Sequence, residues 1–153
     1  MVYVQDIACP ECSLAFGWHV HLHINPVPAE VGRVRRAIRA ALSSWSCFPH
    51  VVEDTVLLAS ELVGNAIKHG PQALVTVNLL ELADRLLLEV TDASPALPKV
   101  HQPLPEDEQG RGMYLVQTVA SAWGTRREPT GGKTTWCTIT LHPGGGGASQ
   151  PSR

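Results

Sequence analysis

The chain has 153 residues, of which 44% are hydrophobic and 17% charged, and its formal net charge is −2. This length and composition predict one ordinary globular domain, because two domains would each be too small for a sizeable core. No basic cluster favours nucleic acid as the main partner, and no apolar run approaches the ~20 residues of a membrane span. Four cysteines without a dense framework, and no signal-peptide apolar region, lead us to expect a cytoplasmic protein without direct nucleic-acid or membrane contacts.

The first segment, residues 1–16, has no clear period, and we expect a poorly ordered N-terminal extension. It contains Cys9-Pro10-Glu11-Cys12, and alternating histidines follow at His19, His21 and His23. Zinc binding is one interpretation of these residues. The alternation of the histidines with apolar residues favours a half-buried strand with the histidines outward, and nothing completes a tetrahedral ligand set. We therefore predict free surface histidines and no zinc.

Two amphipathic helices are predicted next. Apolar residues recur at spacings of 3 and 4 from Ala29 to Leu42. The outer face of this helix carries four arginines, Arg33, Arg35, Arg36 and Arg39. A connection containing Pro49 leads to a second helix, from about Val51 to His69, which Gly70-Pro71 should end.

The middle of the chain predicts a hairpin and a long loop. Ala73–Leu80 and Leu86–Thr91 have strand character and are joined by a short connection. Pro95–Gln109 holds several prolines and an acidic run, so it should continue neither a sheet nor a helix.

The last part predicts a third helix, Met113–Ala122, and two closing strands, Trp123–Arg127 and Thr134–Leu141. The glycine-rich tail, residues 143–153, should be flexible. We expect an α+β fold in which residues 17–142 form a two-layer sandwich, with a mixed, mainly antiparallel sheet covered by about three helices.

One sector of the central helix carries polar side chains beside its core-facing stripe. They are Glu61, Asn65, Lys68 and His69. The carboxylate of Glu61 and the amide of Asn65 lie one turn apart, at i and i+4. Such pairs are common on exposed helices, so the rest of the chain must decide whether this one is functional.

Two later features have the chemistry of a nucleotide site. Asp92 stands where an apolar strand ends, and a carboxylate there can accept a hydrogen bond from an exocyclic amine, worth about 1.5–3 kcal/mol. Gly110-Arg111-Gly112 opens a helix, whose free N–H groups attract phosphate. Gly132-Lys133-Thr134 resembles the end of a P-loop, but Arg127 stands where that motif requires glycine and a strand follows where it requires a helix.

Together these motifs resemble the GHKL (Bergerat) ATPase superfamily over about Val20 to Leu141. Residues 61–69 resemble its N-box, Asp92-Ala93-Ser94 its first glycine box, and residues 110–116 its second. Gly132–Trp136 resembles the segment that closes the last strand. Within the superfamily the chain looks most like anti-sigma factor serine/threonine kinases and stand-alone actinobacterial ATP-binding regulators.

The resemblance implies roles for these positions. Glu61 would be the general base, Asn65 would hold Mg²⁺ at the ATP phosphates, and Asp92 would bind the adenine amino group. Further nucleotide contacts are implied at Lys68, His69, Ser94, Gly110, Arg111, Gly112, Met113 and Thr135. The Pro95–Gln109 loop would be a lid.

The first glycine box departs from the family pattern, because Ser94 and Ala96 stand where the family has glycines. A left-handed Ser94 would cost roughly 1–2 kcal/mol, and Pro95 favours an extended Ser94. We expect a turn of different shape at the adenine end of the site.

Two functions remain open. In the first, the chain phosphorylates an anti-anti-sigma factor and sequesters a sigma factor, and the helix Ala29–Leu42 contributes to a homodimer or to an acidic partner's docking surface. In the second, it is a non-catalytic ATP-binding or ATP-independent interaction module in the same regulation of transcription. The ATP-binding part of a histidine kinase is disfavoured, because the chain has no pair of dimerisation helices.

Overall fold

The computed structural model describes residues 2–4, 18–98 and 111–142. Within these ranges the chain forms six strands and three helices, and all of them except the first strand follow the predicted order. The strands are β1 (Val2–Val4), β2 (His19–Ile24), β3 (Val75–Glu81), β4 (Arg85–Asp92), β5 (Ala122–Arg127) and β6 (Lys133–Thr140). The helices are α1 (Ala29–Ser44), α2 (Pro49–His69) and α3 (Arg111–Val119).

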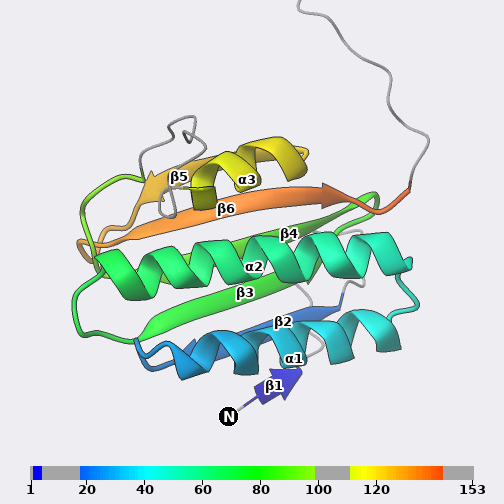
Figure 1. The fold of residues 1–153 in the computed structure, drawn as a ribbon, viewed down its shortest axis with the longest axis horizontal. Coiled ribbons are helices and arrows are strands. Elements are labelled where there is room, and N and C mark those ends of the chain that lie inside the picture. Colours follow the sequence, from blue (N-terminus) through cyan, green and yellow to red (C-terminus); the bar gives the residue numbers. More distant parts are fainter. Residues whose placement is uncertain (1, 5–17, 99–110, 143–153) are drawn as a thin grey trace, which may run out of the picture.

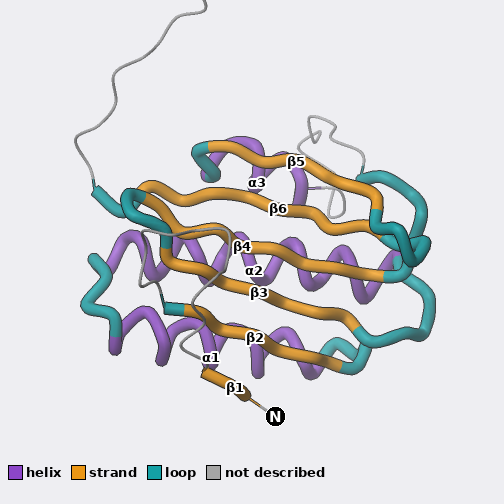
Figure 2. The backbone as a smooth tube through the Cα atoms, turned by 180° about the vertical axis from the view of Figure 1, so that it is seen from behind, coloured by secondary structure: helices purple, strands orange, loops and turns teal. Residues whose placement is uncertain are grey.

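The strands form one sheet in the order β1-β2-β3-β4-β6-β5, and every pairing is antiparallel. All three helices cover one face of this sheet (Figure 1), and the view from behind shows the strands in front of them (Figure 2). The expected two-layer α+β sandwich is confirmed. The core lies between the layers, since the inward side chains of β2, β3, β4 and β6 are buried against the helices.

The central helix α2 is held by its apolar stripe. Leu58, Val63 and Ala59 are fully buried, and α2 contacts both neighbouring helices as well as β3, β4 and β6. It begins at Pro49, two residues earlier than predicted. Proline suits the first turn of a helix because its φ angle is already helical and because an N–H at this position would have no partner within the helix. The helix ends at Gly70, as expected.

The third helix is shorter than predicted. It ends at Val119 because the chain is already part of the sheet a few residues later, where the Ser121 N–H donates to the Thr138 carbonyl at 2.8 Å. β5 then starts at Ala122. The apolar period of 113–122 does not distinguish the last turn of a helix from the first residues of an edge strand.

Part of the predicted N-terminal extension joins the sheet. Val2–Val4 pairs antiparallel with β2, opposite Val20 and Leu22. The Cys9–Cys12 motif, Gly110 and most of the predicted lid, and the tail of residues 143–153 lie outside the described residues.

The strand histidines do lie on the helix-free face, but they are not free. His21 pairs with Asn78 through Nδ1, its Nε2 lies 2.9 Å from Nε2 of His23, and Nδ1 of His23 lies 3.2 Å from the Thr76 hydroxyl. In the described ranges, no three His, Cys, Asp or Glu side chains gather as a metal site requires. No helix among the described residues is long and apolar enough to cross a membrane.

The buried Cys137 thiol should be unreactive in the folded protein. It lies in the core of β6, where burial raises its pKa to about 12. Thiolate is the reactive form, so iodoacetamide at pH 8 should leave the Cys137 peptide unlabelled until denaturant is added, as mass spectrometry can show. Cys47 is only partly buried and serves as the internal comparison. Rapid labelling of Cys137 without denaturant would mean that β6 opens.

Candidate functional site

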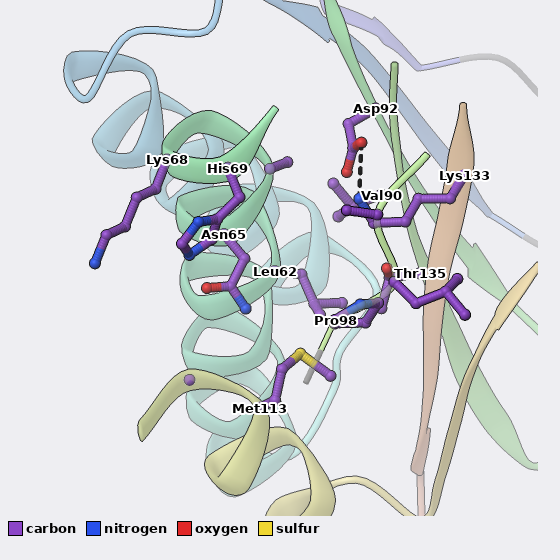
Figure 3. Close-up of a pocket in the computed structure, with 14 residues that line it drawn as sticks. Leu62, Asn65, Lys68, His69, Val90, Asp92, Pro98, Met113, Lys133 and Thr135 are labelled. Carbon is purple, nitrogen blue, oxygen red and sulfur yellow. Dashed lines mark hydrogen bonds and ion pairs between the residues drawn. The ribbon is translucent and has the colours of Figure 1, made fainter. Parts of the chain in front are cut away.

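A cavity of about 620 Å³ lies between α2, the ends of β4 and β6, and the start of α3 (Figure 3). Its walls are mostly apolar, with a few polar side chains. The lining residues are Leu62, Asn65, Ala66, Lys68, His69, Val90, Asp92, Ala96, Leu97, Pro98, Gly112, Met113, Lys133 and Thr135. A concave, largely apolar chamber with a few convergent polar groups is the usual form of a small-molecule site.

The last turns of α2 supply one wall. Figure 3 shows Asn65 and His69 on the side of α2 that faces the cavity, while the Lys68 side chain extends away from Asp92. Lys68 and His69 are exposed, and Asn65 is half-buried. The helical spacing predicted that these three residues share one sector of α2. The apolar stripe of α2, which packs into the core, determines the direction in which this sector faces.

The start of α3 packs closely against the polar sector of α2. A Cβ atom placed on Gly112 would lie 2.8 Å from Oε2 of Glu61 and 3.4 Å from Nδ2 of Asn65. With glycine at this position, the backbone comes this close without moving either side chain. The N-box residues and the second glycine box, far apart in the sequence, therefore meet in space.

Glu61 lies beside the cavity rather than in its lining. Burial raises the pKa of its carboxyl above the ordinary value. A carboxylate that is partly removed from water binds a proton more readily, which is the property required of a general base.

Asp92 forms a buried ion pair with Lys133. The Lys133 Nζ lies 3.0 Å from Oδ1 of Asp92, and the two side chains are only 8% and 5% exposed. The strands bring them together, since Asp92 ends β4 directly opposite Lys133, which begins β6. This pairing was not foreseen.

The turn after Asp92 replaces the glycines of the family pattern with side-chain hydrogen bonds. The Ser94 N–H donates to Asp92 Oδ1 at 2.8 Å, and the Ala96 N–H donates to the Ser94 hydroxyl at 3.3 Å. Ser46 is the one non-glycine residue with a positive φ in the described part of the chain, so Ser94 bears no left-handed strain. The expectation of a differently shaped turn agrees with this geometry.

Most of the predicted site residues converge here. Asn65, Lys68, His69, Asp92, Gly112, Met113 and Thr135 line the cavity. Ser94 is buried behind Asp92, Gly110 lies outside the described residues, and Arg111 begins α3 without its side chain being described. Lys133 was not among the site residues predicted from the sequence. A usable signal was its spacing of two residues from Thr135, which puts both side chains on the same face of β6.

The residues present fit a magnesium–nucleotide complex. The apolar lining suits a base, the carboxylate of Asp92 suits an amino group, and the start of α3 at Gly112 could donate backbone N–H groups to phosphates. The amide oxygen of Asn65 is a hard donor of the kind that Mg²⁺ prefers.

A two-layer sandwich with a polar helix end, a strand-end carboxylate and a glycine at a helix start around one cavity has the features of a nucleotide-binding domain. A model of the histidine kinase-like ATPase domain matches residues 24–139, so the chain belongs to that ATP-binding family. The fold also resembles the crystal structure of the RsbU and RsbW domains of Rv1364c from Mycobacterium tuberculosis, with a TM-score of 0.59 and 21% identity. That match covers 80% of this chain and 33% of the other. No curated protein matches the chain.

Replacing Gly112 with alanine should weaken ATP binding without unfolding the protein. The added methyl would crowd the Asn65 amide, the expected metal ligand, as well as the Glu61 carboxylate. Both groups are movable ends of side chains, so the cost falls on the site rather than on the core. We expect about a tenfold loss of affinity, the effect of disturbing one charged hydrogen bond, measured by calorimetry. Gly32→Ala in α1 is the matched control, because Gly32 is remote from the cavity. Equal affinities in the two variants would contradict the close approach.

Proposed function

We propose that the protein is an ATP-dependent regulator that phosphorylates a serine or threonine of a protein partner. The observation that carries the proposal is the close approach of the Gly112 backbone to the side chains of Glu61 and Asn65, beside a cavity that Asp92 also lines. A general base, a metal ligand and a backbone anion site would thus be next to one another, as phosphoryl transfer requires.

Each residue would have one task. Asp92 would accept a hydrogen bond from the adenine amino group, Asn65 would contribute its amide oxygen to Mg²⁺, and the α3 N-terminus would donate N–H groups to phosphate. Bound Mg-ATP would supply the transferable phosphoryl group and the compensating charge. Glu61 would accept the proton of the partner's hydroxyl.

The partners we propose are an anti-anti-sigma factor as substrate and a sigma factor as the sequestered protein. The support is the resemblance in sequence motifs and the likeness of the fold to a structure whose printed name includes an RsbW domain. Labelled ATP, Mg²⁺ and the protein, mixed with candidate partners of this class, should yield a labelled serine or threonine. Mg-ATP binding without any transfer would favour the second candidate function, a non-catalytic module. The observation that favours this candidate is the ion pair of Lys133 with Asp92, the residue expected to bind adenine.

The basic face of α1 gives a test of partner docking. Arg33 pairs with Glu30 at 3.0 Å, and Arg39 pairs with Glu53 on α2. No ion pair of Arg36 is found in the described ranges, so its charge is the more available for an acidic partner. We expect Arg36→Glu to weaken partner binding or dimerisation about tenfold, because it would place like charges next to each other in the interface, and to leave ATP affinity unchanged. Light scattering measures dimerisation, and a surface-based binding assay measures partner binding. Unchanged association in the variant would argue against this surface.

A further inference from the structure

Lys133 is a buried cation inside the cavity with part of its hydrogen-bonding capacity unused. Its Nζ donates to Asp92 Oδ1 at 3.0 Å and approaches the Ser94 carbonyl at 3.5 Å. A lysine ammonium has three N–H donors, so one remains. Because Lys133 lines the cavity, that donor is available to a ligand there.

The local backbone fixes this cation beside Asp92. Gly132 approaches the end of β4 so closely that a Cβ atom there would lie 2.1 Å from the Asp92 carbonyl oxygen. The strand register then places Lys133 opposite Asp92, with both side chains on the helix side of the sheet. Figure 3 shows the ammonium next to the carboxylate, joined to it by a dashed line.

The carboxylate also keeps one oxygen for a ligand. Both hydrogen bonds that Asp92 accepts from described residues, from the Ser94 N–H and from Lys133, end on Oδ1. Oδ2 is therefore left as an acceptor, and the ammonium beside it is a donor. The pair presents an acceptor and a donor side by side, the pattern of a side-chain amide rather than of an isolated carboxylate.

The Watson–Crick edge of adenine has the complementary pattern. Its 6-amino group is a donor and the adjacent N1 is an acceptor. An isolated carboxylate can accept a hydrogen bond from the amino group, but it has no donor for the lone pair of N1. N1 would then need a water molecule as its donor. A carboxylate paired with an ammonium satisfies both groups.

We propose that Lys133 is a specificity-determining residue, whose ammonium donates a hydrogen bond to N1 of adenine while Asp92 Oδ2 accepts one from the 6-amino group. The inference rests on the proposed ATP site and adds a reader of N1 to it. The competing explanation is that Lys133 only neutralises Asp92, in which case affinity does not depend on N1.

The test compares ATP with 1-deaza-ATP, in which N1 is replaced by a C–H group, and with 7-deaza-ATP as the matched control. Calorimetry with Mg²⁺ and the wild-type chain should show 1-deaza-ATP binding about tenfold to a hundredfold more weakly than ATP, the loss expected for one charged hydrogen bond. The control should bind as tightly as ATP, because N7 lies on another edge of the base. Equal binding of 1-deaza-ATP and ATP overturns the proposal.

Variants connect the effect to the side chain. In Lys133→Met, checked for folding by circular dichroism at low temperature, the preference for ATP over 1-deaza-ATP should vanish, whereas Lys133→Arg should keep it. A preference that persists in a folded Lys133→Met overturns the assignment, and if that variant does not fold, the wild-type comparison decides alone. A wild-type chain that binds none of the three nucleotides overturns the ATP site itself, which is a different result from binding all three equally.

Discussion

Replacing Glu61 with glutamine is expected to lower phosphotransfer by about 10²–10⁴-fold, the usual contribution of a positioned general base, while ATP still binds. Glutamine keeps the shape of the side chain and loses the capacity to accept a proton. Glu61 lies beside the cavity, next to Gly112, rather than among the lining residues, so the nucleotide should lose no contact. Labelled-phosphate transfer to the partner and calorimetry with Mg-ATP measure the two effects separately.

The same substitution has a predictable sign in stability. Because burial raises the pKa of Glu61, the unfolded chain releases this proton at lower pH than the folded chain does. The wild type therefore loses stability as pH rises from the ordinary glutamate pKa of about 4.3 through the folded value. The Gln variant lacks that loss, so its melting temperature should equal or exceed that of the wild type at pH 7.

A matched control exists on the same helix. Glu53→Gln makes the same chemical change at an exposed position that pairs with Arg39, and it should leave phosphotransfer intact. Full transfer in Glu61→Gln would remove Glu61 from the mechanism. Loss of transfer in both variants would point to a general effect on α2 instead.

The sequence was sufficient for the layer architecture, because the periods of its apolar residues differ between helices and strands. The resemblance of its motifs to a known family also grouped Asn65, Asp92 and Gly112 in one expected nucleotide site. The confirmed family supports the GHKL-type fold that those motifs implied.

Features that depend on contacts between distant segments were harder to predict. Nothing local to Lys133 says that β6 runs antiparallel to β4 in the register that places it opposite Asp92. The hydrogen bonds of Ser94 likewise depend on the carboxylate two residues earlier and on the backbone turn, and the expected problem of a left-handed serine did not arise. Strand order and register are set by the whole sheet, so single-site reasoning missed the ion pair.

That ion pair should matter strongly for stability. Lys133→Met removes one partner and leaves the Asp92 carboxylate buried without a counter-charge. Breaking a buried pair in this way typically costs about 3–5 kcal/mol, which for a domain of this size lowers the melting temperature by roughly 10 °C. Thermal unfolding followed by circular dichroism at pH 7 measures the change.

The double variant Asp92→Asn/Lys133→Met separates the cost of an unpaired charge from the value of the pair. With both charges gone, the desolvation of two ions disappears together with their attraction, so the double variant should recover most of the stability lost in Lys133→Met. Arg85→Met, which breaks the exposed pair with Asp84, should leave the melting temperature almost unchanged, because solvent screens exposed ion pairs. If Lys133→Met were as mild as Arg85→Met, water would reach Asp92 freely, which would contradict the burial of this pair.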